Sequence, residues 1–99
     1  DSEDALPTEF SLSQNFPNPF NPVTSINFDI AENGNINLDI YDIKGNQIST
    51  LVSGYYSIGT YSIQWDGLDN FGKEVSSGIY IYQLRYPNGI ITKKMTLVR

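Results

Sequence analysis

The chain has 99 residues, 39% of them hydrophobic, with a net charge of −5, no cysteine and no histidine. Without cysteine it has no disulfide, thiolate nucleophile or thiolate metal site, and without histidine it lacks the usual general base and the commonest metal ligand. The acidic charge argues against a nucleic-acid partner. These numbers predict one globular, non-catalytic domain without a cofactor.

The first nine residues, DSEDALPTE, are acidic and small and include a proline. This composition is typical of a linker. Because the chain starts at Asp1 without a methionine or an apolar leader, we expect it to be a piece of a longer protein. The sequence therefore predicts a linker over residues 1–9 and one domain over residues 10–99.

The next segment, QNFPNPFNP at residues 14–22, has three prolines and three asparagines around two phenylalanines. Proline fixes φ and has no amide donor, so this segment is expected to be extended and not paired with a strand. Phe16 and Phe20 are expected to anchor it on the rim of the core. The asparagines, which favour turns, are expected to cap turns within it.

Apolar and polar residues then alternate with period two, which is the strand pattern. Ile26, Phe28 and Ile30 share one face, as do Ile36, Leu38 and Ile40. Counting a first short strand at residues 10–14, the strands are expected at 10–14, 24–30, 35–41, 46–51, 60–65, 79–86 and 90–98. About seven short antiparallel strands predict an all-β fold, specifically an immunoglobulin-like β-sandwich with Trp65 and a tyrosine row in its core.

Glycines mark the connections between these strands. Asn33-Gly34, Lys44-Gly45 and the PNG stretch at residues 87–89 predict tight turns. Gly78 begins a strand, where glycine is expected to allow a close backbone approach or a bulge.

The stretch WDGLDNFGK offers Asp66, Asp69 and Asn70 as oxygen ligands in a loop with two glycines. Such ligands suit Ca²⁺, although the spacing differs from that of an EF-hand and no glutamate stands at the twelfth position. The alternative is structural: Asp and Asn side chains that bond to the backbone of their own loop. We prefer that alternative, so no metal site is predicted.

Tyrosines give a second candidate site, because flat aromatic rings stack on sugars. Tyr55, Tyr56 and Tyr86 are the candidates for an exposed carbohydrate-binding face. Tyr80 and Tyr82 alternate with their neighbours in a strand and are expected in the core instead.

The basic residues gather at the end of the chain. Residues 1–42 contain no Lys or Arg, whereas residues 85–99 contain Arg85, Lys93, Lys94 and Arg99 and no acid. Lysines on a final strand are consistent with a protected sheet edge. That is the preferred interpretation, and the alternative is a strand that pairs with a partner strand and selects an acidic partner.

Four segments, SQNFPNPFNPVTSINFDI, LDIYDIKGNQISTLV, WDGLDNFGKEVSSGIYIYQL and TKKMTLV, follow one another in this order. Together they resemble the type A C-terminal sorting domain of the type IX secretion system, from about Leu6 to Arg99. The segments WDG and SSGIY are also similar to the immunoglobulin-like domain of the flagellar hook-capping protein.

The resemblance implies a monomeric, non-catalytic secretion signal that follows a cargo domain. It would direct exported cargo from the periplasm through an outer-membrane translocon to the cell surface or the medium. A sortase-like peptidase would cut the linker. The recognition residues that it implies are Pro17, Asn18, Pro19, Gly78, Tyr80, either Lys93 or Lys94, Leu97, Val98 and Arg99.

A different class of function remains open. An accessory immunoglobulin-like module of a secreted enzyme, acting as a spacer or a carbohydrate binder, would have the same fold and composition. The resemblance favours the sorting domain, and the tyrosines are the feature that would support the accessory module.

Overall fold

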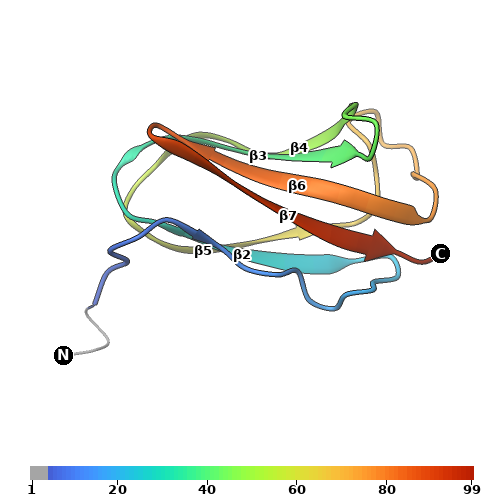
Figure 1. Ribbon diagram of the computed structural model, residues 1–99, viewed down its shortest axis with the longest axis horizontal. Coiled ribbons are helices and arrows are strands. Elements are labelled where there is room, and N and C mark those ends of the chain that lie inside the picture. The colour runs from blue at the N-terminus through green and yellow to red at the C-terminus, as the bar shows by residue number, and fades with distance from the viewer. Residues whose placement is uncertain (1–4) are drawn as a thin grey trace.

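The computed structural model describes residues 5–99, which form a two-layered β-sandwich (Figure 1). The linker predicted over residues 1–9 therefore lies partly outside the described residues. Within residues 5–99, no helix is long and apolar enough to cross a membrane. The strands are β1 (Ser11–Leu12), β2 (Thr24–Ile30), β3 (Gly34–Asp42), β4 (Gln47–Tyr56), β5 (Gly59–Trp65), β6 (Gly78–Tyr86) and β7 (Gly89–Leu97).

The strands are divided between two antiparallel sheets. One has the order β1-β2-β5 and the other the order β4-β3-β6-β7. In Figure 1 the four-stranded sheet is the upper layer, and β2 and β5 lie below it. The predicted all-β, immunoglobulin-like sandwich is confirmed.

The core lies between the inner faces of the two sheets, as the alternation predicted. The side chains of Ile26, Phe28 and Ile30 from one sheet and of Ile36, Leu38 and Ile40 from the other are at most 2% exposed. Each strand that carries apolar residues at every second position buries that face, because successive side chains point to opposite sides. The core residues are Leu12, Phe20, Ile26, Phe28, Ile30, Ile36, Leu38, Ile40, Val52, Trp65, Tyr80, Tyr82, Leu84, Met95 and Leu97.

Two of the predicted tight turns are present. Gly45 has a φ of 90° in the hairpin between β3 and β4, and its N–H donates to the Asp42 carbonyl at 3.0 Å. Pro87 and Asn88 connect the paired residues Tyr86 and Gly89 at the hairpin between β6 and β7.

The prediction of a tight hairpin turn at Asn33-Gly34 is wrong. Neither residue has a positive φ, and β2 and β3 lie in different sheets. Here the chain crosses from one sheet to the other, and the Asn33 side chain accepts a hydrogen bond from the Ile58 N–H at 2.8 Å. Asn-Gly is a local signal, whereas the sheet in which a strand lies depends on tertiary packing.

The reason predicted for Gly78 is also wrong. Nothing lies within 4 Å of the place where a Cβ would stand, and Gly78 pairs regularly with Leu97, so neither a close approach nor a bulge requires glycine there. Its φ of 157° is a conformation that other residues rarely adopt, and this backbone geometry favours glycine at the start of β6.

Candidate functional site

The segment at residues 14–22 connects the two sheets. Phe16 exchanges two backbone hydrogen bonds of 2.9 Å with Ser25 of β2. Phe20 donates its N–H to the Thr96 carbonyl at 3.0 Å and accepts from the Val98 N–H at 2.9 Å. The prediction of an unpaired segment is therefore wrong, because Phe16 and Phe20 are not prolines and use their backbone N–H and C=O groups to pair with both sheets.

The two phenylalanines of this segment have opposite environments. Phe20 is 2% exposed and its ring lies 5.7 Å from that of Trp65, whereas Phe16 is 79% exposed. The prediction that both would anchor the segment is thus correct for Phe20 and wrong for Phe16. The backbone of Phe16 is fixed by its bonds to Ser25, so its ring is held out in solvent.

Asn15 and Tyr82 form a buried polar link between this segment and β6. The Tyr82 hydroxyl donates to the Ser13 carbonyl at 2.7 Å and accepts from the Asn15 N–H at 2.8 Å. The Asn15 side chain donates to the Thr24 hydroxyl at 2.9 Å and to the Pro17 carbonyl at 3.1 Å. Burial raises the pKa of Tyr82, which stays a neutral donor. The spacing of residues did not predict this link, because its partners are distant in sequence.

Pro17, Asn18 and Pro19, which the resemblance assigns to recognition, are exposed. Asn18 was expected to cap a turn within its own segment. Instead, its side chain accepts a hydrogen bond from the Thr96 N–H at 3.0 Å. It therefore closes part of the free edge of β7. Asn18 contributes to the fold and to the surface at the same time.

Tyr80, which the resemblance assigns to recognition together with Gly78, belongs to the core. It is 6% exposed, its ring lies 5.4 Å from Trp65 in an edge-to-face arrangement, and its hydroxyl donates to the Ser76 carbonyl at 2.6 Å. A partner cannot contact this ring without unfolding the strand. Its role in the folded domain is packing, as its alternation in the strand predicted.

The last residues of the chain are also part of the fold. Leu97 is 1% exposed, whereas Val98 is 48% exposed. Arg99 donates from its guanidinium to the Gly67 carbonyl at 2.7 Å and to the Val75 carbonyl, and lies 3.7 Å from Glu74. Arg99 thus fixes the end of β7 to the loop between β5 and β6.

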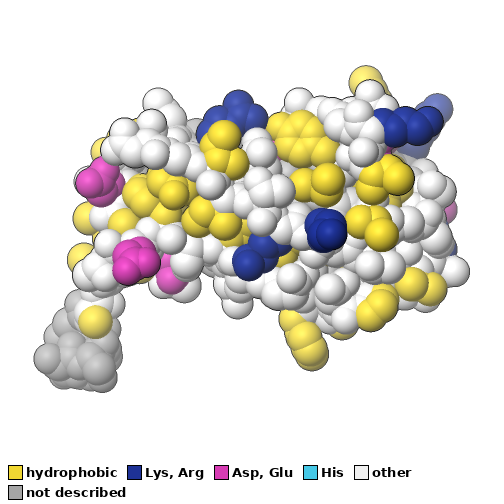
Figure 2. Space-filling view, in the orientation of Figure 1, with side chains coloured by type: hydrophobic (Ala, Val, Ile, Leu, Met, Phe, Trp, Pro, Cys, Tyr) yellow, Lys and Arg dark blue, Asp and Glu magenta, His cyan; other side chains and the backbone are white. Residues whose placement is uncertain are grey.

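Lys93 and Lys94 occupy successive positions in β7 and so point to opposite sides of its sheet. Lys93 is partly buried and pairs with Tyr82 across the ladder, whereas Lys94 is exposed. Basic side chains lie in the middle and at the upper right of the face shown in Figure 2, while most of the acidic ones lie toward its left end.

The structure brings the three separate motifs together around β7. Gly78 and Tyr80 pair with Leu97 and Met95 on one side of the strand. Asn18 and Phe20 contact the other side of its final residues. The sequence motifs therefore meet at one strand. Their exposed members are Pro17, Asn18, Pro19, Lys94, Val98 and Arg99.

The loop of the weak metal candidate is held by its own side chains. The Asp66 carboxylate accepts from the Leu68 N–H at 3.2 Å, and that of Asp69 accepts from the Phe71 and Lys73 N–H groups at 2.9 and 3.0 Å. The Asn70 side chain accepts from the Thr50 N–H at 3.0 Å. In the part of the chain that the structure describes, no three acidic, His or Cys side chains are grouped to hold a metal ion.

A groove of about 520 Å³ lies beside this loop, between the edge strands β4 and β5. Its lining combines partly buried apolar side chains, Leu51 and Ile63, with the polar Thr50 and Asn70. Asn70 already accepts the Thr50 N–H, so the loop covers part of this edge.

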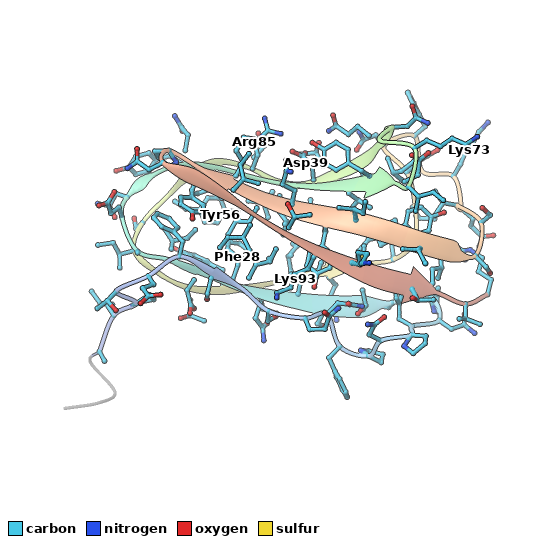
Figure 3. The ribbon with its side chains drawn as sticks, in the orientation of Figure 1. Phe28, Asp39, Tyr56, Lys73, Arg85 and Lys93 are labelled. Carbon is cyan, nitrogen blue, oxygen red and sulfur yellow. The ribbon has the colours of Figure 1, made fainter. Side chains whose placement is uncertain are left out.

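The three candidate sugar-binding tyrosines do not form one face. Tyr55 is 67% exposed, but its neighbour Tyr56 points into the sandwich, where its ring lies 5.0 Å from Tyr61 and 6.2 Å from Phe28 (Figure 3). The ring of Tyr86 is stacked on that of Phe10 at 3.9 Å. These tyrosines therefore do not form the common platform that the carbohydrate-binding alternative needs, since adjacent residues of a strand face opposite sides.

A buried carboxylate on the outer face of the four-stranded sheet was not predicted. Asp39 is 5% exposed although it alternates with core residues. It accepts hydrogen bonds from the Thr50 hydroxyl at 2.8 Å and from the Gln47 amide at 3.2 Å, and lies 3.9 Å from Arg85 (Figure 3). Its partners come from β4 and β6, so only the strand register could reveal them.

Comparison with known proteins gives a family and three related folds. The model of the FlgD Ig-like domain family matches residues 20–89. No curated protein sequence matches the chain significantly. Dimeric latent PorU from Porphyromonas gingivalis is similar over 86% of this chain and 9% of its own, at 24% identity and a TM-score of 0.69.

Two further solved structures are similar. FlgD from P. aeruginosa has 21% identity and a TM-score of 0.58 over 75% of this chain and 57% of its own. PorZ from P. gingivalis, described as an essential surface component of the type IX secretion system, has 18% identity and a TM-score of 0.60 over 91% of this chain and 11% of its own. The chain spans only a part of each of these proteins, and the likeness to them is one of fold.

Proposed function

The chain belongs to the FlgD Ig-like domain family, and within this fold we propose that it is a non-catalytic C-terminal sorting domain of the type IX secretion system. It directs a cargo protein through the outer-membrane translocon. The observation that carries the proposal is the meeting of three distant motifs at β7, where Asn18 and Phe20 contact one side and Gly78 and Tyr80 support the other. The similar fold of PorZ supports the same secretion system.

A sorting signal needs an independent fold and a specific surface. A continuous core and the links from residues 14–22 to both sheets provide the first. The exposed Pro17, Pro19 and Lys94, with the partly buried Lys93, provide the second. In this proposal Gly78, Tyr80, Leu97 and Arg99 build the strand that carries the surface, and the translocon contacts the exposed members.

The cargo precedes the domain, which acts as a monomer. The protein crosses the periplasm and ends at the outer-membrane surface or in the medium. A sortase-like peptidase cuts the segment before the domain, where Leu6 is 60% exposed and therefore accessible.

The test is a transplant of the whole domain. A reporter with an N-terminal export signal, followed by residues 1–99, is expected at the surface or in the medium of a bacterium with a type IX system. The same reporter without residues 10–99 should stay in the periplasm, as should the fusion in a strain without the translocon.

A reporter that leaves the cell equally well without the domain would contradict the proposal, as would a fusion retained in the periplasm of the competent strain. Deletion of residues 90–99 is a poorer test. It removes Met95 and Leu97, each 1% exposed, and would unfold the sandwich.

A further inference from the structure

The outward edge of β7 has a closed part and an open part. Tyr86 and Gly89 are the closing pair of a two-residue hairpin, so odd-numbered residues of β7 bond to β6. Even-numbered residues then direct their N–H and C=O groups away from the sheet. Thr96 and Val98 follow this rule, because their outward groups bond to Asn18 and Phe20.

The same alternation places the backbone groups of Ile90, Thr92 and Lys94 on this edge. The side-chain amide of Gln14 donates a hydrogen bond to the Lys94 carbonyl at 2.7 Å. The N–H groups of Ile90, Thr92 and Lys94 have no hydrogen-bond partner within residues 5–99. The same holds for the carbonyls of Ile90 and Thr92. All three residues are exposed, and an added strand would approach them beside β1, which lies close to β7.

Two lysines, Lys93 and Lys94, flank this open edge, and neither has a counterion among the described residues. Arg85 lies 3.9 Å from Asp39, and Arg99 lies 3.7 Å from Glu74. Neither Lys93 nor Lys94 has a carboxylate within 4.0 Å among the residues that the structure describes. Figure 3 shows Lys93 on β7 on the side of the other sheet, and Lys94 lies on the opposite face of the strand.

We propose that residues 90–94 of β7 dock an extended acidic segment of the partner that reads the sorting domain, as an added strand. This inference rests on the proposed function. Outward N–H and C=O groups provide the ladder, as in other cases of strand addition. Because the lysines lie on both faces of β7, the segment carries successive acidic residues, whose side chains also point to both faces.

Other occupants of this edge are less favoured. A second copy would bring the lysines of two β7 strands together and join two domains with a charge of −5 each. The lysines alone, acting as protection against aggregation, would leave the edge empty. Each alternative gives a distinct result in the test.

The test removes one outward N–H and leaves the fold intact. Thr92→Pro deletes a donor that points away from β6, which an edge strand tolerates, and Thr92→Ala is the control that retains it. The probe is a synthetic strand-forming peptide with two central acidic residues, added to the isotope-labelled 99-residue chain. Amide exchange should slow at Ile90, Thr92 and Lys94, with at least tenfold weaker binding to Thr92→Pro than to Thr92→Ala.

A second variant, Lys93→Glu with Lys94→Glu, keeps every amide and should also weaken binding at least tenfold. If the melting curve of Thr92→Pro shows that this variant does not fold, the double variant tests the proposal in its place. Equal binding by Thr92→Pro and its control, protection at β4 instead, self-association, or no protection at millimolar peptide would each overturn the proposal.

Reporter fusions separate the two proposals. If the Thr92→Pro fusion is sorted as well as the Thr92→Ala fusion while the domain-free reporter stays behind, strand docking is wrong and the sorting function stands. If the domain-free reporter is sorted, the proposed function itself is wrong.

Discussion

The two edges of the four-stranded sheet are closed by the same device in different settings. At β7 the Asn18 side chain accepts the Thr96 N–H, and at β4 the Asn70 side chain accepts the Thr50 N–H, both at 3.0 Å. The segment at residues 14–22 also inserts Phe20 into the core, at 2% exposure. The loop at residues 66–75 instead leaves Phe71 89% exposed. The closure at β7 is therefore part of the core, whereas the closure at β4 lies on the surface.

This difference teaches that a proline-rich segment can be more structural than a loop within the sandwich. The segment at residues 14–22 bonds to β2, β6 and β7 and places Phe20 in the core, whereas the loop at residues 66–75 is held by its own carboxylates, by Arg99 and by Asn70, which bonds to β4. Substitutions in the segment at residues 14–22 should reduce the stability of the whole domain. Substitutions in the loop at residues 66–75 should make only that loop more mobile.

The largest expected effect comes from Phe20→Ala. It removes a buried ring beside Trp65 and should lower the free energy of unfolding by about 3–5 kcal/mol. Phe16→Ala is the matched control and should change it by no more than about 0.5 kcal/mol, because that ring is in solvent. Urea titration measures both, and equal losses would show that the segment is not anchored by Phe20.

Tyr82→Phe should have the next largest effect. It leaves the Ser13 carbonyl and the Asn15 N–H without their partner, at a cost of about 1–3 kcal/mol near pH 7. Since burial raises the folded-state pKa of Tyr82 above its ordinary value of 10.0, this stabilisation is complete below pH 10.0 and is lost as the pH rises through the folded-state pKa. Urea titrations from neutral to alkaline pH should therefore show a narrowing gap between the two proteins. A constant gap would contradict the assigned link.

The smallest effects distinguish the two asparagines. Asn18→Ala and Asn70→Ala should each cost about 0.5–1.5 kcal/mol, because each removes one exposed hydrogen bond. Amide exchange should accelerate at Thr96 in the first variant and at Thr50 in the second. Faster exchange at both sites in either variant would mean that the edges are not independent.

The same pair tests recognition. With a fold retained in both variants, a reporter fusion that carries Asn18→Ala should be sorted poorly, and one that carries Asn70→Ala should be sorted normally. Equal sorting would mean that Asn18 acts as a structural brace alone.

Alternation predicted most of the fold but little of the segment at residues 14–22. It identified the inner faces of β2, β3 and β6, because burial there follows directly from period two. It did not distinguish Phe16 from Phe20, since both have the same local neighbours of proline and asparagine. The resemblance supplied the motif residues, but only the register of β7 showed which of them are exposed.

The pairing of Asn18 with Thr96 joins residues that are 78 positions apart. During synthesis or export from the N-terminus, the segment at residues 14–22 emerges early and finds its partners on β7 only when that strand has emerged. Its closure on β7 therefore marks a nearly complete domain, and a copy cut before β7 would leave Asn18 and Phe20 without the partners that β7 provides. The contacts of Asn18 and Phe20 with β7 therefore form only in a chain that has been made or exported almost to its end.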